Sequence, residues 1–119
     1  MQVNTINALL GLTMSSITGT KGDDEMIFTT MNGQKFKFYH EQSCCENVSI
    51  EDIVGDLTEL VGSPILIAEE TTSETEDLSS DQVIRWTFYR FATIKGTVTV
   101  RWYGSSNGYY STEVSFDEI

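Results

Sequence analysis

Apolar and polar residues alternate through three extended segments in the last third of the chain. Residues 83–91 carry apolar side chains on both sides, which is typical of a central strand or of a strand covered by another subunit. Residues 97–103 and 110–116 place most of their apolar side chains on one side. These patterns predict three strands of one sheet, and the inward positions of the middle strand are Val98, Val100 and Trp102.

The clearest hairpin in the first half of the chain spans residues 26–40. Its two arms alternate in polarity, and Phe36 and Phe38 share one face of the second arm. Between the arms lies Asn32-Gly33, a residue pair that favours a type I′ turn. The pattern therefore predicts two paired antiparallel strands.

Residues 49–61 repeat apolar side chains at the spacing of an amphipathic helix. Ser49 is a good N-cap, and Gly62 followed by Pro64 would end the helix. The pattern predicts the principal helix of the protein, with an apolar stripe that covers one face of the sheet. That stripe consists of Ile50, Ile53, Val54, Leu57, Leu60 and Val61.

Residues 69–82 form the most acidic stretch of the chain. They contain six acidic residues, no basic residue and one large apolar residue, Leu78. A segment of this composition buries too little apolar surface to join a core, so it is interpreted as an exposed, mobile loop. The acids are Glu69, Glu70, Glu74, Glu76, Asp77 and Asp81.

Together these patterns predict an α+β fold: a mainly antiparallel sheet of about six strands with one principal helix packed on one face. Weaker patterns predict a short helix near residues 4–12 and strands at 14–18 and 65–68. A length of 119 residues is that of a single domain, residues 1–119. The start of the chain lacks a basic region before its apolar run, so we expect no signal peptide and no membrane span.

The net charge of −11, with a pI near 4.2, argues against general DNA or RNA binding, because such a field repels phosphate. It favours solubility, a basic protein partner or mimicry of nucleic acid. Walker, nucleophile-elbow, HExxH and dinucleotide-binding motifs are absent from the sequence. Catalysis by a pair of carboxylates stays open, but acids are so abundant that no single pair is informative. We expect a protein that is not an enzyme and that needs no cofactor.

Cys44 and Cys45 are neighbours, and adjacent cysteines rarely bridge. The sequence predicts two reduced thiols and an intracellular, cytoplasmic protein. With His40 they could form half of a metal site, although zinc needs about four ligands. A Cys–His nucleophilic pair would also need a third, orienting group. Packed residues that join a strand to a helix are the simpler interpretation.

Positive and aromatic residues gather in the last third, which holds all three arginines. Guanidinium groups bind phosphate and aromatic rings stack on bases, so a pocket for a small nucleotide is one interpretation. The alternative is that the arginines pair with carboxylates while the aromatic side chains form core or a subunit interface. The candidate ligand-binding residues are Arg85, Arg90, Arg101, Trp102, Tyr103 and Asn107.

Three segments, 39–57, 63–70 and 86–116, resemble a family of small phage and bacterial proteins classed as a domain of unknown function. The phrase RWYGSSNGYYS, residues 101–111, is the most specific part. The resemblance implies a phage or prophage setting in the host cytoplasm. It supplies no catalytic residues, and by analogy with small phage proteins it points to counter-defence.

Three functional hypotheses follow. The first is a homo-oligomeric sponge that sequesters a nucleotide-like immune signal, of cyclic ADP-ribose or cyclic oligonucleotide type, as anti-Thoeris proteins do. The second is an acidic inhibitor of a host defence protein, of anti-CRISPR or nucleic-acid-mimic type, whose acidic stretch meets a basic partner. The third is a metal or thiol site at His40, Cys44 and Cys45.

Overall fold

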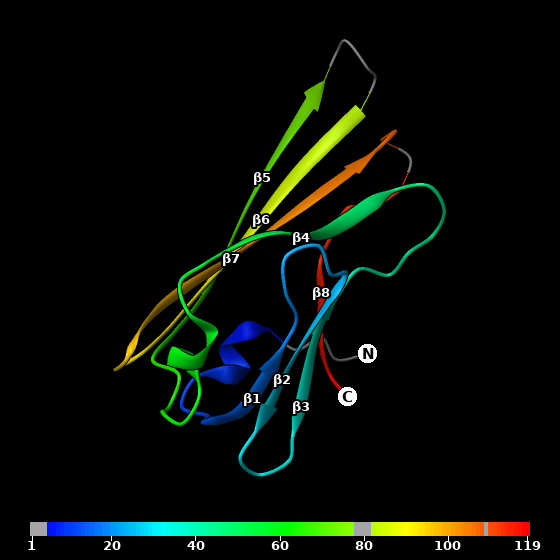
Figure 1. Ribbon diagram of the computed structural model, residues 1–119. Helices are drawn as coiled ribbons and strands as arrows, with labels where there is room; N and C mark the ends of the chain where they lie inside the picture. Colours follow the sequence, from blue (N-terminus) through cyan, green and yellow to red (C-terminus); the bar gives the residue numbers. More distant parts are fainter. Residues whose placement is uncertain (1–4, 78–81, 109) are drawn as a thin grey trace.

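The computed structural model describes residues 5–77, 82–108 and 110–119, and consists of two antiparallel four-stranded sheets packed face to face (Figure 1). The short sheet has the order β1-β2-β3-β8, and the long sheet has the order β4-β7-β6-β5. The short sheet comprises β1 (Met14–Thr18), β2 (Glu25–Thr30), β3 (Lys35–Tyr39) and β8 (Ser115–Glu118). The long sheet comprises β4 (Asn47–Val54), β5 (Ile67–Asp77), β6 (Gln82–Thr93) and β7 (Gly96–Ser106).

The predicted α+β class is therefore wrong. Among the described residues, the helical segments are two short 3-10 turns, η1 (Ile6–Leu9) and η2 (Leu57–Leu60). Neither has the length or the apolar surface that would cover a sheet, and the second sheet takes the place of the predicted helix as the other half of the core. In this part of the chain, no helix has both the length and the apolar character needed to cross a membrane.

The core lies between the two sheets and is rich in aromatic side chains. Phe28 and Phe38 of the short sheet meet Phe91 and Tyr89 of the long sheet, with ring centroids 5.1 and 4.8 Å apart. All four residues are buried. Offset and edge-on aromatic contacts of this kind stabilise a core beyond the effect of burial alone.

Residues 49–61 form a bulged strand and a 3-10 turn instead of the predicted helix. Ile50 lies opposite Trp102 and Ile53 opposite Val100, with a register shift between them. The bulge inserts one extra residue, so two positions three apart face the same side of a strand. A helix gives the same spacing, which explains why the pattern was misread. Gly55, with φ of +108°, then turns the chain toward η2.

Residues 69–77 belong to β5 and not to a loop. All eleven residues of β5 pair with β6 in an uninterrupted antiparallel register, from Ile67 opposite Ala92 to Asp77 opposite Gln82. β5 is an edge strand, and its exposed residues cover no core. The low apolar content of this segment correctly predicted that its side chains are exposed. It did not mean that the backbone is unpaired. Residues 78–81, and with them Asp81, lie outside the described residues.

Several other predicted strands are confirmed, while of the strand predicted at 65–68 only Ile67 and Ala68 are strand, as the start of β5. The hairpin of residues 26–40 is β2 and β3, and the strands predicted at 14–18, 83–91 and 97–103 lie within β1, β6 and β7. Two details differ. The Asn32-Gly33 pair sits in a longer loop, closed where Thr30 N–H donates to the carbonyl oxygen of Gln34. The strand predicted at 110–116 is wrong: residues 111–114 are not strand, and β8 (Ser115–Glu118) lies in the short sheet, so the three segments of the last third do not form one sheet.

The long sheet extends well past the short sheet at one end, where β5, β6 and β7 project together (Figure 1). At the other end the turns of η2 pack against β6 and β7. Thr93 Oγ1 donates to the carbonyl oxygen of Glu59 at 2.5 Å, and Lys95 Nζ donates to the carbonyl oxygen of Val61.

Candidate functional site

The outer face of the long sheet, the face away from the core, carries a row of large side chains. Along β6, Thr87, Tyr89 and Phe91 are buried, so the alternate residues point outward. None of these outward apolar residues belongs to the core cluster of the described residues. We call this surface the aromatic face; it consists of Ile84, Trp86 and Phe88 of β6 with Arg101 and Tyr103 of β7.

Three members of the aromatic face contact one another. The Arg101 guanidinium lies 5.4 Å from the centroid of the Trp86 ring, which is the range of a cation–π contact. The Tyr103 ring meets Trp86 edge-on, with centroids 4.9 Å apart. These contacts hold Trp86 in place, so the face presents an ordered ring to solvent.

Each arginine is paired with carboxylates. Arg101 Nε donates to Glu51 Oε1 at 2.7 Å, and its NH2 group lies 3.7 Å from Asp52. Arg90 donates to Glu69 at 2.8 Å. These pairs are partly exposed, so each contributes about 0–1 kcal/mol to stability, but they neutralise the positive charge locally.

Arg85 is also paired, on the opposite face of the sheet. It donates to Glu74 at 3.0 Å and lies 3.7 Å from Glu113. These groups line a hollow of about 300 Å³ beside β6. Because Glu74 and Glu113 both line it, the hollow carries a net negative charge and does not suit a phosphate.

The structure brings together three of the six predicted ligand-binding residues and separates the others. Arg90, Arg101 and Tyr103 point to the outer face, whereas Arg85 points to the inner face. Trp102, only 1% exposed, lies in the core between the sheets, where it packs and cannot stack on a ligand. Asn107 lies exposed in the bend after β7. The six side chains therefore do not line one pocket in a single chain.

β5 is the edge strand of the long sheet, and those of its acidic side chains that the structure describes, Glu69, Glu70 and Glu74, contact β6. Glu69 and Glu74 pair with arginines, as described above, and Glu70 accepts a hydrogen bond from the Tyr89 hydroxyl at 3.1 Å. Burial, and then the Glu70 charge, raise the pKa of Tyr89 well above its ordinary value, so the hydroxyl stays a donor. Residues 69–75 are all exposed.

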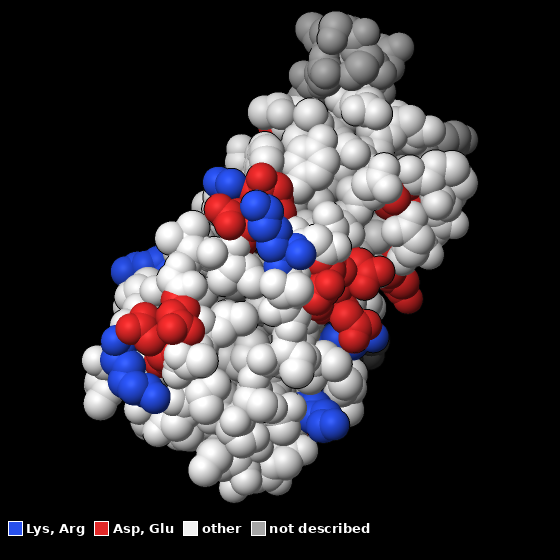
Figure 2. Space-filling model, viewed as in Figure 1, with Lys and Arg blue, Asp and Glu red and all other residues white. Residues whose placement is uncertain are grey.

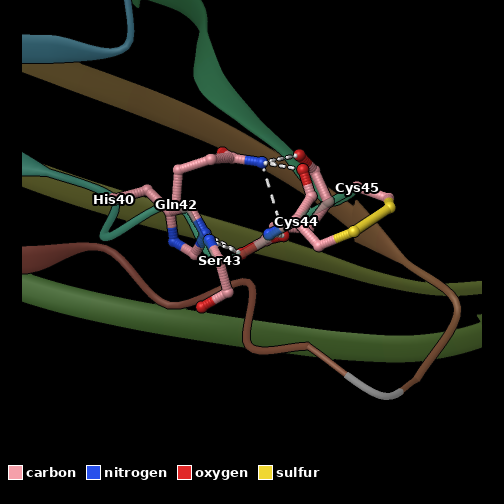
Figure 3. Close-up of a disulfide and its surroundings, with 6 residues drawn as sticks. His40, Gln42, Ser43, Cys44 and Cys45 are labelled. Carbon is pink, nitrogen blue, oxygen red and sulfur yellow. Dashed lines mark hydrogen bonds and ion pairs between the residues drawn. A yellow bond between two sulfur atoms is a disulfide. The ribbon is translucent and has the colours of Figure 1, made fainter.

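A separate cluster surrounds the cysteines (Figure 3). Cys44 and Cys45 form a disulfide, so the prediction of two reduced thiols is wrong. Both cysteines are exposed, while the neighbouring Glu46 is buried. The Glu46 carboxylate accepts from the backbone N–H groups of Ser43 and Cys44, each at 2.9 Å, and from His40 Nε2 at 2.8 Å.

The pKa of Glu46 reflects two opposing causes. Burial alone would raise it, but the hydrogen bonds from His40 and from the two backbone N–H groups outweigh burial and lower the pKa to about 2. Glu46 is thus an ionised anchor that holds the loop between β3 and β4. His40 serves this anchor, because its Nδ1 contacts the carbonyl oxygen of Glu113 at 2.7 Å.

Within the described residues, no three His, Cys, Asp or Glu side chains are grouped so that they could hold a metal ion. This includes His40, Cys44 and Cys45, where a half-site was considered. On the face seen in Figure 2, several blue basic groups lie beside red acidic ones. Charge on that face is interleaved instead of being collected in one basic patch.

The fold and this surface define a small β-sandwich with a half-buried aromatic face and an exposed acidic edge strand. The profile of a protein family described as a domain of unknown function, DUF7448, matches residues 7–116. The chain belongs to this family, as the resemblance of its segments predicted. No curated protein and no solved structure matches the chain.

Two features of the candidate site were not found from the sequence. Trp86 is not among the predicted ligand-binding residues. The alternation of residues 83–91 does place it on the same side of the strand as Ile84 and Phe88. The edge position of β5 was hidden, because strand order depends on pairing between distant segments. Only the run of β-branched residues, Thr71, Thr72 and Thr75, pointed to a strand.

Proposed function

We propose that the chain is a non-enzymatic, acidic binding protein that docks onto a basic protein partner through the long sheet. The observation that carries the proposal is the position of β5. This strand has five acidic residues and no basic residue, and it is an exposed edge directly beside the aromatic face.

The combination resembles the anatomy of protein–protein interfaces, in which aromatic and arginine side chains form the centre and charged residues the rim. Here Trp86, Tyr103 and Arg101 are held together by mutual contacts. Glu69 of β5 lies on the same face beside Arg90, and Glu51 and Asp52 of β4 lie on the other side of the three residues. Glu70 and Glu74 extend from the same edge strand toward the opposite face. A basic partner would meet negative charge on both sides of an aromatic centre.

The net charge adds to this local effect. A protein with a charge of −11 attracts a basic partner at long range and raises the rate of encounter. Surface charges separated by more than about 10 Å are screened at ~0.1 M salt, so association should weaken as salt rises.

The biological setting rests on the family resemblance alone. In that setting the chain would be a phage-type protein in the host cytoplasm, and its partner a host defence protein with a basic surface. Inhibition would come from occupying that surface, which requires no catalytic group and no cofactor.

Sequestration of a nucleotide-like signal stays a prediction, and the geometry supports it less. Each arginine already has a carboxylate partner, and the six candidate side chains are divided between two faces. Phosphate binding would have to displace those carboxylates. Isothermal titration with cyclic ADP-ribose isomers and cyclic oligonucleotides is expected to give no heat; saturable heat that Arg101→Ala abolishes would restore this function.

Site-specific cross-linking tests the docking proposal. A photoreactive amino acid is placed at Ser73, on the outer face of β5, and in a matched control at Ser16, an exposed position of β1. We expect one protein to be cross-linked from Ser73 and not from Ser16 in the cells that produce the chain. That protein, purified, should bind the unmodified chain at least about tenfold more weakly at ~300 mM than at ~50 mM salt.

Two results would overturn the proposal. One is equal cross-linking from Ser73 and Ser16, which would mean that the long sheet is not the docking surface. The other is a purified partner whose affinity does not change with salt, because an acidic edge that selects a basic partner must act through charge.

A further inference from the structure

β5 offers the longest unpaired strand edge in the described part of the chain. The other edge strands are shorter, and β4 is interrupted by its bulge. Natural proteins protect exposed edges with short strands, bulges, proline or charged side chains, lysine most often. β5 has eleven residues in regular register and contains no proline and no lysine. β5 could therefore accept another strand at its free edge. Its acidic residues restrict which strand can be added.

The turn between β6 and β7 shows which backbone groups of β5 are free. This turn has two residues, Ile94 and Lys95, and a two-residue turn closes on a hydrogen-bonded pair, here Thr93 and Gly96. Hydrogen-bonded and non-hydrogen-bonded pairs alternate along an antiparallel strand pair. The odd-numbered residues of β6, like Thr93, therefore bond to β7, and the even-numbered residues point their N–H and C=O groups to β5. The partners of these residues are the odd-numbered residues of β5.

The even-numbered residues of β5 consequently point their backbone groups to the free edge. η1 packs against β5, and a hollow between residues 5–7 and residues 68–71 lies near the start of the strand. By the alternation above, Glu70, Thr72 and Glu74, which are all exposed, point their backbone groups to the free edge, Glu70 beside that hollow and the other two beyond it. These three residues form the part of the edge that a new strand could reach.

The side chains at this edge select the strand that can be added. A second copy paired antiparallel about Thr72 would bring Glu70 opposite Glu74, and a parallel pair in register would put each acid beside itself. Like charges directly opposite each other destabilise a strand pair. Self-association through β5 is therefore disfavoured, and homo-oligomers would have to form through another surface.

We infer that β5 takes an extended segment of a basic partner as a fifth strand of the long sheet, with lysine or arginine at alternate positions beside Glu70, Thr72 and Glu74. The opposite side of that segment would lie next to Thr71 and Ser73, on the same face as the aromatic face, and would carry apolar residues. Main-chain hydrogen bonds supply affinity and the alternating side chains supply specificity. This inference rests on the proposed function and specifies how the partner is held.

Two peptides of the same composition test the inference. The probe is acetyl-Thr-Lys-Val-Lys-Val-Lys-Thr-amide, which alternates basic and apolar residues, and the control is acetyl-Lys-Lys-Lys-Val-Val-Thr-Thr-amide. Hydrogen exchange of backbone amides is followed by NMR. We expect the alternating peptide to slow exchange at Glu70, Thr72 and Glu74 by about tenfold or more, whereas the control peptide does not.

A substitution on β5 provides a second readout. Thr72→Pro removes one free N–H group at a position where an edge strand accepts proline, and Thr72→Val keeps the N–H group as the matched control. We expect Thr72→Pro to weaken binding of the alternating peptide by about tenfold or more and Thr72→Val to leave it within about twofold. The amide-exchange measurement on the unmodified protein does not depend on the folding of either variant.

The outcomes separate the two proposals. Slowed exchange at the three amides supports strand addition. Salt-sensitive binding of both peptides without that protection would overturn strand addition and leave the docking proposal in place. Failure of both peptides to bind would also overturn strand addition, while docking is judged by the cross-linking from Ser73.

Discussion

His40 Nε2 lies 2.8 Å from the Glu46 carboxylate, and both side chains are buried, with exposed fractions of 3% and 0%. The other ring nitrogen of His40 faces the carbonyl oxygen of Glu113 at 2.7 Å. Both ring nitrogens of His40 therefore contact oxygen atoms, one of the Glu46 carboxylate and one of the backbone. This pair links the loop after β3 to the segment before β8.

Glu46→Gln should destabilise the protein, because the amide cannot accept all the hydrogen bonds that the two carboxylate oxygens now receive. Glu41→Gln is the control, since Glu41 is an exposed acid five residues away. Urea unfolding should give a clearly lower midpoint for Glu46→Gln than for Glu41→Gln. Equal midpoints would show that the buried carboxylate is not an anchor.

The same group predicts a pH dependence. The pKa of Glu46 is lowered from 4.5 to about 2, mainly by hydrogen bonds that overcome the effect of burial. A carboxyl whose pKa is lower in the folded state stabilises the fold above its unfolded pKa, and this contribution is lost as the pH falls toward the folded pKa. The difference in unfolding free energy between the wild type and Glu46→Gln should therefore shrink between about pH 5 and pH 2.

Gly55 should not tolerate a side chain. A Cβ atom there would lie 2.7 Å from the carbonyl oxygen of Thr97, and φ is +108°. Gly22 has a similar φ of +96° but no atom within 4 Å of the added Cβ, so Gly22→Ala measures the backbone strain alone. Chemical denaturation should show a loss of about 1–3 kcal/mol for Gly22→Ala and a larger loss for Gly55→Ala. Equal losses would contradict the close approach to β7.

The two tryptophans should respond differently to alanine. Trp102 is buried in the core, so Trp102→Ala should cost about 3–5 kcal/mol of unfolding free energy. Trp86 lies on the aromatic face with a cation–π and an edge-on ring contact, so Trp86→Ala should cost only about 1–2 kcal/mol. Trp86→Ala should nevertheless abolish partner binding. Large destabilisation by Trp86→Ala would place it in the core instead.

The Cys44–Cys45 disulfide should contribute little to stability. The disulfide joins adjacent residues and closes no loop of other residues. It therefore lowers the entropy of the unfolded chain much less than a disulfide between distant residues does. A Cys44→Ser, Cys45→Ser double variant should unfold within about 1 kcal/mol of the wild type, because Glu46 still holds the loop. Thiol alkylation of the native protein, read by mass spectrometry, should find no modified cysteine before reduction; complete modification would contradict the bridge.

Alternation of apolar and polar residues correctly identified the strands that bury one face in the core. The prediction failed where a β-bulge or an exposed edge strand changed the spacing or the polarity of the residues. Phe36 and Phe38, and Val98 and Val100, alternate because each strand has one face on the core. Ile50 and Ile53 are three apart because a bulge lies between them, and the bulge depends on the pairing of β4 with β7. The acids of β5 indicated exposure correctly, but the backbone pairing of β5 with β6 is independent of side-chain polarity.

The candidate site was predicted in part for the same reason. Arg101 and Tyr103 were placed outward correctly, because Trp102 between them had to be inward. The mistake was to treat Arg85 and Trp102 as neighbours of the outward arginines. Residues one apart on a strand point to opposite faces, so clustering in sequence does not mean clustering on a surface.

The most direct test of the account is an NMR titration of the chain with the partner recovered by cross-linking. We expect the largest amide shifts at β5 and at Trp86 and Phe88 of β6, and we expect them to fade as salt is raised. Shifts centred on the short sheet, or shifts at β5 that are indifferent to salt, would contradict docking of a basic partner on the long sheet.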